Sequence, residues 1–121
     1  MEKEFVPYEL ALELKKLGFF EECLGFYIWQ SWNNNSRLEI GNDDEYTCET
    51  IKAPLYQQTF RFFREKYNLL GSPVPCDFNR KDTKFDFIIN GNMNYRYLSY
   101  EEVKLECLKK LIELAKEQNV K

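Results

Sequence analysis

The chain contains no histidine, so the commonest catalytic base is missing. A Ser-His-Asp or Cys-His mechanism is therefore excluded. The sequence also lacks the phosphate-binding patterns GxxxxGKS/T and GxGxxG, the GxSxG nucleophile turn and the HExxH zinc motif. We therefore expect a protein that is not an enzyme and that needs no cofactor.

Closely spaced cysteine pairs are also missing. The four cysteines are Cys23, Cys48, Cys76 and Cys107, and no two of them form a CxxC pair. Structural zinc sites usually use ligand pairs at short spacing, so a metal site built from these cysteines is disfavoured. In a reducing compartment we expect them to be buried, free thiols.

No apolar run approaches the roughly 18 residues that a membrane span needs. The first four residues are mostly charged and are not followed by the apolar segment of a secretory signal. These two absences predict a cytoplasmic protein without a membrane partner.

An overall basic charge, which would suggest general nucleic-acid binding, is absent. The net charge is −3, but it is unevenly distributed. Residues 1–51 carry 4 basic and 11 acidic groups, whereas residues 52–96 carry 8 basic and 4 acidic groups. The middle segment therefore has two interpretations, a local basic face that binds an anion or an ordinary solvated surface.

The length of 121 residues fits a single globular domain, 1–121, with one core. Residue periodicity predicts an α+β fold in which three helices pack on a small antiparallel sheet, in the order α-β-β-(β)-α-β-β-α. The predicted helices are 7–17, 54–67 and a last one from Ser99, and the predicted strands are 25–32, 37–40, 46–51, 84–90 and 92–97.

Short sequence signals mark several element ends. Gly18 is placed to end the first helix in a left-handed conformation, and Asn68 to end the central one. The dipeptide Asn90-Gly91 predicts a tight hairpin turn. Residues 71–75 predict a stiff loop or an edge segment because of their prolines, and residues 79–82 predict a turn.

The last helix has the clearest start. Ser99 and Glu102 have the spacing of a capping box, in which a serine side chain and a glutamate satisfy free backbone groups. The apolar face of this helix is unusually broad, which predicts burial against two neighbours, either sheet and helix or sheet and a second subunit. Its apolar residues are Val103, Leu105, Cys107, Leu108, Leu111, Ile112, Leu114 and Ala115.

The central helix supplies the first candidate site. Its four rings at i, i+4, i+7 and i+11 form one stripe, which is typical of a helix that lies on a sheet; they are Tyr56, Phe60, Phe63 and Tyr67. Gln57, Arg61 and Arg64 fall on the opposite side, where the arginines either solubilise the helix or bind phosphate or carboxylate. Phe62 lies off the stripe and, if exposed, marks a protein contact.

Further candidates lie outside this helix. Arg80, Lys84, Tyr95 and Arg96 extend the possible ligand site. Arg80 and Lys84 belong to the basic middle segment, and residues 90–97 mix amide, aromatic and guanidinium groups that suit a nucleotide or sugar. The same composition is also that of an ordinary loop. Candidate interface residues are Tyr27, Trp29 and Trp32, since both sides of their strand are apolar or aromatic.

Carboxylates leave metal chemistry formally open. Asp43, Asp44 and Glu45 form an acidic cluster, but they lack the spacing of a calcium-binding loop, and a plain surface loop is the simpler interpretation. We interpret Asp86 as solvated charge.

Several segments together resemble a known group of sequences. These segments are 53–67, 99–102 and 107–111, with 8–14 and 17–19 near the N-terminus. They resemble a group of small uncharacterised proteins from phages and mobile elements of gut Bacteroidetes. The resemblance implies a phage or mobile-element context, and hence host cytosol, but no activity and no site residues.

Three hypotheses follow. The first is a non-catalytic binding protein that acts as an accessory or modulates a host pathway such as defence, by sequestering a small anionic signal such as a nucleotide. The second is a structural or protein–protein interaction module that forms a homo-oligomer. The third is a metal-dependent enzyme that uses carboxylates.

Overall fold

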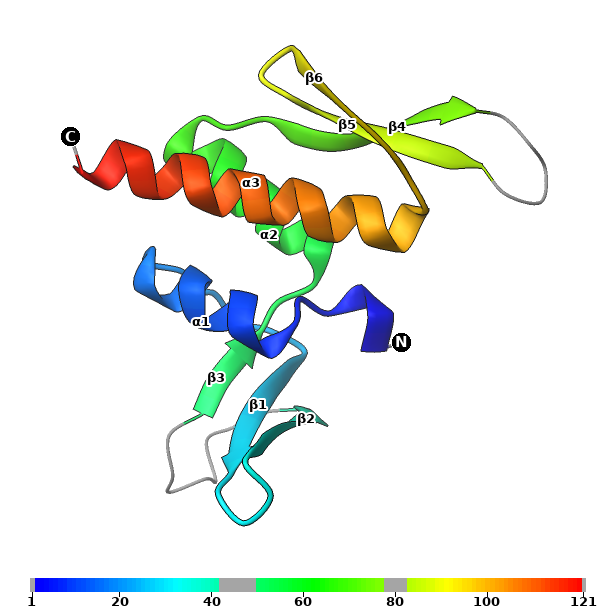
Figure 1. The fold of residues 1–121 in the computed structure, drawn as a ribbon. Helices are drawn as coiled ribbons and strands as arrows, with labels where there is room; N and C mark the ends of the chain where they lie inside the picture. Colours follow the sequence, from blue (N-terminus) through cyan, green and yellow to red (C-terminus); the bar gives the residue numbers. More distant parts are fainter. Residues whose placement is uncertain (1, 42–49, 78–82, 121) are drawn as a thin grey trace. The chain divides into compact units, whose positions relative to one another are not determined.

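The computed structural model describes residues 2–41, 50–77 and 83–120 (Figure 1). Contacts divide the chain into two compact units, Met1–Gln58 and Thr59–Lys121. The single domain over residues 1–121 stays a prediction. No helix in the described ranges is long and apolar enough to cross a membrane.

The α+β class is confirmed. The elements follow in the order Glu2–Glu4 (a 3-10 turn), α1 Tyr8–Lys16, β1 Gly25–Gln30, β2 Asn35–Ile40, β3 Thr50–Ala53, α2 Tyr56–Tyr67, β4 Gly71–Asp77, β5 Lys84–Ile89, β6 Asn92–Leu98 and α3 Tyr100–Val120.

The strands form two sheets, whereas the sequence predicted one. Each sheet has three antiparallel strands, in the orders β2-β1-β3 and β4-β5-β6. Strands that follow one another in the chain tend to pair, and α2 separates the first three strands from the last three. The proline-containing segment predicted as a loop or an edge segment is the edge strand β4.

In the first unit, α1 ends in the predicted way. Gly18 has φ of 95°, in the left-handed region. The backbone N–H of Phe19 donates to the carbonyl of Leu14 at 3.0 Å, and that of Gly18 donates to Lys15 at 3.1 Å. This pair of bonds is a Schellman motif, which satisfies carbonyls that the helix end would otherwise leave unpaired.

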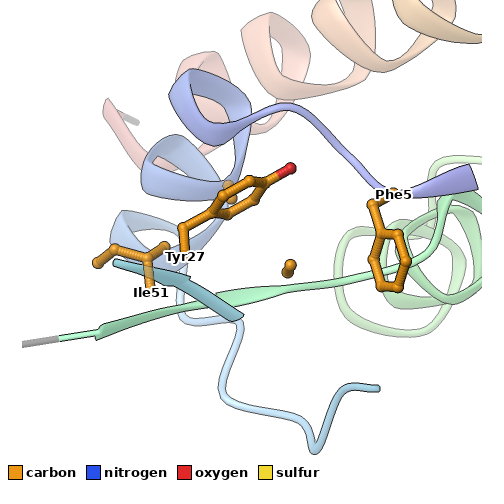
Figure 2. Close-up of a cluster of buried hydrophobic side chains, with 5 residues drawn as sticks. Phe5, Tyr27 and Ile51 are labelled. Atoms are coloured by element: carbon orange, nitrogen blue, oxygen red, sulfur yellow. The ribbon is translucent and has the colours of Figure 1, made fainter. Parts of the chain in front are cut away.

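The core of the first unit joins its N-terminal segment to its sheet. Phe5, Tyr27 and Ile51 are buried together (Figure 2). The Tyr27 hydroxyl donates a hydrogen bond to the Val6 carbonyl at 2.6 Å. Because this buried hydroxyl has a partner, the ring adds apolar area to the core without leaving a polar group unsatisfied.

In the second unit, β5 and β6 form a tight hairpin. Asn90 and Gly91 have φ values of 51° and 84°, so both occupy the left-handed region that a two-residue turn needs. The Asn90 side-chain oxygen also accepts the backbone N–H of Leu70 at 2.7 Å. The predicted turn is confirmed, and it is tied to the segment that precedes β4.

Helix α3 follows β6 directly and lies along this sheet (Figure 1). The Ser99 hydroxyl accepts the backbone N–H of Glu102 at 3.2 Å and donates to the Glu102 carboxylate at 2.8 Å, which confirms the predicted helix start. The broad apolar face is largely buried; its fully buried members are Val103, Cys107, Leu108, Leu111, Ile112 and Ala115.

Candidate interaction surface on strand β6

Strand β6 forms one edge of the sheet β4-β5-β6. Most of its side chains are exposed, on both faces of the strand. Tyr95 is 82% exposed and Tyr97 is 59% exposed, Met93 is exposed on the same strand, and Tyr100 is exposed at the start of α3. Large apolar and aromatic side chains are usually buried, so their concentration on an edge strand distinguishes this part of the unit. These four residues are called the β6 surface below.

A bulge shapes the second half of β6. Phe87 pairs with Asn94 and Phe85 pairs with Leu98, so residues 95–97 of β6 all lie opposite Asp86. Tyr97 has φ of 52°, a conformation that non-glycine residues with bulky side chains rarely adopt. Bulges of this kind redirect side chains and often lie at sheet edges.

Asp86 holds the bulge in place. One oxygen of its carboxylate accepts the backbone N–H groups of Arg96 and Tyr97, each at 2.9 Å. The residue is only 8% exposed. Our interpretation of Asp86 as solvated charge was wrong, because its side chain satisfies two backbone groups that the bulge removes from regular strand pairing.

A groove of about 450 Å³ lies between the end of β6 and the first turns of α3. Arg96 and Leu98 line it from β6, and Glu102, Leu105 and Glu106 line it from α3. Its wall therefore combines two carboxylates, one guanidinium and two apolar side chains.

Two of the three groove charges have partners in the second unit. The Glu102 carboxylate accepts a hydrogen bond from the Ser99 hydroxyl, and the Glu106 carboxylate lies 3.7 Å from the ammonium group of the exposed Lys109. Within the described ranges, no ion pair joins Arg96 to either glutamate of the groove.

Of the predicted ligand residues that the structure describes, only Arg96 lines the groove. Arg61 and Arg64 are exposed on α2 within the second unit, and Gln57 is exposed on the part of α2 that belongs to the first. Lys84 is half-buried on β5. Arg80 lies outside the described residues, and Tyr95 belongs to the β6 surface.

The predicted interface residues differ in exposure. Tyr27 is buried in the core of the first unit, and Phe62 is buried against Phe63 and Tyr67, with ring centroids at 5.4 and 5.9 Å. Neither ring has the exposure that an interface residue needs, because each one packs inside its own unit. Trp29 is 46% exposed and Trp32 is 76% exposed, so both remain available for contacts.

Sequence reasoning missed much of the surface around β6. Met93, Tyr97 and Tyr100 were not candidates, and of the groove glutamates Glu102 had an interpretation only as part of the capping box. One signal was present in the sequence: the capping box at Ser99 begins α3 one residue after β6 ends, which brings the first turns of α3 close to Arg96.

The described residues contain no group of three or more His, Cys, Asp or Glu side chains that could hold a metal ion. Asp43, Asp44, Glu45 and Cys48 lie outside these residues. Burial raises the pKa of the Cys107 thiol to about 12 and, partly offset by Lys52, that of Cys23 to about 11. Both thiols therefore stay protonated near neutral pH, which makes them weak nucleophiles.

No protein-family model, curated protein or solved structure matches this chain.

Proposed function

We propose that the protein is a non-catalytic interaction module that associates with a second copy of itself through the β6 surface. The observation that carries this proposal is the exposure of Met93, Tyr95 and Tyr97 along an edge strand. Tyrosine, methionine and arginine are enriched at protein interfaces, and an edge strand offers unpaired backbone groups to another strand.

The sequence of β6 suits pairing with itself. In an antiparallel pair centred on Asn94, Met93 of one copy lies opposite Tyr95 of the other, and Asn92 lies opposite Arg96. Methionine sulfur and aromatic rings attract one another. Arg96 is the only charged residue in the strand, so this register places no like charges opposite each other.

A nucleotide-binding function has weaker support. Arg96 shares its groove with two glutamates, which would repel a phosphate. Arg61 and Arg64 are exposed on α2, and neither of them lines this groove. The resemblance to phage and mobile-element proteins is compatible with an accessory role in a host, exerted through protein contacts.

Sedimentation velocity over a wide concentration range tests the proposal. We expect a monomer–dimer equilibrium in the wild-type protein. Met93→Glu should weaken the dimer at least tenfold, because each copy then buries an unpaired carboxylate opposite Tyr95. Trp32→Ala is the matched control, since it removes another exposed ring, in the first unit, and should leave the dimer unchanged.

A charge swap tests the register. In the double variant Met93→Glu with Tyr95→Lys, each new carboxylate faces a new ammonium group of the other copy, so dimer formation should recover relative to Met93→Glu alone. A wild-type chain that stays monomeric at millimolar concentration would refute the proposal. If the double variant does not recover dimer formation although its circular dichroism spectrum matches that of the wild type, the register is refuted.

A further inference from the structure

We infer that the groove between β6 and α3 binds a small ligand with two ammonium groups and one carboxylate, of the class of basic amino acids. The groove wall carries the complementary set, which is two carboxylates from Glu102 and Glu106 and one guanidinium from Arg96. Most of the groove wall belongs to α3, whereas Arg96 also takes part in the β6 pair, where it lies opposite Asn92 of the other copy.

The spacing of the carboxylates fits such a ligand. Glu102 and Glu106 are four residues apart on α3, so they lie on one face about 6 Å apart along the helix axis. The two ammonium groups of an extended basic amino acid are separated by a similar length. Arg96, on the opposite wall, can bind the ligand carboxylate through two parallel hydrogen bonds.

The apolar part of the groove fits the rest of the ligand. Leu98 and Leu105 are both half-buried, one on each wall. They offer apolar surface to the methylene chain that joins the two ammonium groups. A nucleotide lacks this distribution of charge, and a purely apolar ligand would not complement the two carboxylates and the guanidinium group of the wall.

A titration followed by amide NMR shifts tests the inference with three probes. L-lysine carries all three charges, L-norleucine lacks the side-chain ammonium group, and 1,5-diaminopentane lacks the carboxylate. We expect lysine to bind with a Kd on the order of millimolar, as is usual for a ligand of this size in an open site. The amides of Leu98 and Leu105 should shift, and both other probes should bind more weakly.

Two variants separate the contributions. Arg96→Gln should weaken lysine binding about two- to fivefold and leave diaminopentane binding unchanged. Glu106→Gln should weaken both lysine and diaminopentane by a similar factor and affect norleucine least. Glu117→Gln, at an exposed position farther along α3, is the matched control and should change nothing.

The inference is overturned if lysine causes no shifts up to tenfold above the expected Kd, or if sodium chloride at the same ionic strength causes the same shifts. It is also overturned if norleucine binds as tightly as lysine. The dimer measurement stays independent, because Glu106→Gln alters neither Met93 nor Tyr95.

Discussion

Replacement of Asp86 should loosen the β6 bulge and destabilise the second unit. The carboxylate accepts two backbone N–H groups at 2.9 Å, those of Arg96 and Tyr97. A hydrogen bond to a charged group contributes about 1.5–3 kcal/mol to stability. Both donors lie in an exposed strand where water can replace the carboxylate, so the lower end applies. We expect Asp86→Ala to lower the free energy of unfolding by about 3 kcal/mol.

Asp86→Asn is the matched variant. It keeps an oxygen of the same shape but removes the charge, and neutral hydrogen bonds are about half as strong as charge-assisted ones. The expected loss is therefore about 1.5 kcal/mol. Urea unfolding followed by circular dichroism gives both values, with the slope of the transition checked for separate unfolding of the two units.

Hydrogen exchange locates the effect. In the wild-type protein the Arg96 and Tyr97 amides should exchange slowly for an exposed strand, and Asp86→Ala should speed their exchange more than that of other amides in β6. A loss below about 0.5 kcal/mol for Asp86→Ala, which is the size of an ordinary surface substitution, would refute the reasoning. The reasoning would also be refuted if Asp86→Ala lost much stability while the Arg96 and Tyr97 amides kept their protection from hydrogen exchange.

Three further predictions concern packing and ionisation. A methyl group at Gly71 would lie 2.9 Å from a Leu111 methyl carbon, so Gly71→Ala should cost about 1–3 kcal/mol in urea unfolding. Burial raises the Cys107 pKa from 9.0 to about 12; above pH 9 the unfolded chain loses this proton and the folded chain keeps it. Stability should therefore fall as pH rises from 9 towards 12, by up to about 1.4 kcal/mol per pH unit relative to Cys107→Ala, and equal slopes would contradict this. The Trp29 ring stacks on the Tyr8 ring with centroids 5.5 Å apart, so Trp29→Ala should lower the free energy of unfolding by about 1 kcal/mol. Trp32→Ala should lower it by less than about 0.5 kcal/mol, and equal losses would contradict the difference in contacts.

Features that depend on neighbouring residues could be predicted from the sequence. The left-handed residues Gly18, Asn68 and Asn90 and the capping serine Ser99 all act within a few residues of their own position. Each of them ends or begins an element through a bond or a backbone conformation that the local sequence already defines. The element order followed from these signals together with periodicity.

Features that depend on distant residues could not be predicted in this way. The bonds from Asp86 reach ten and eleven residues along the chain, and they exist because of a bulge that leaves no periodic signal. The sequence analysis placed Phe62 outside the apolar stripe of α2, because the expected stripe was too narrow. In the structure its ring packs on two other rings of that helix. The division of the strands into two sheets likewise depends on which strands meet in space.

The sheet of the second unit also limits how far association through β6 can proceed. Its other edge is β4, where Pro73 and Pro75 lack the backbone N–H that an added strand needs. The bulge interrupts the pairing of β6 with β5 after Asn94, whereas an antiparallel pair about that residue uses the opposite, free edge of β6 in both copies at once. Association through this sheet should therefore stop at two copies, and the mass in sedimentation should reach a plateau at twice 14.6 kDa. Continued growth beyond that plateau in the wild-type protein, abolished by Met93→Glu, would show that β6 does not pair in this closed arrangement.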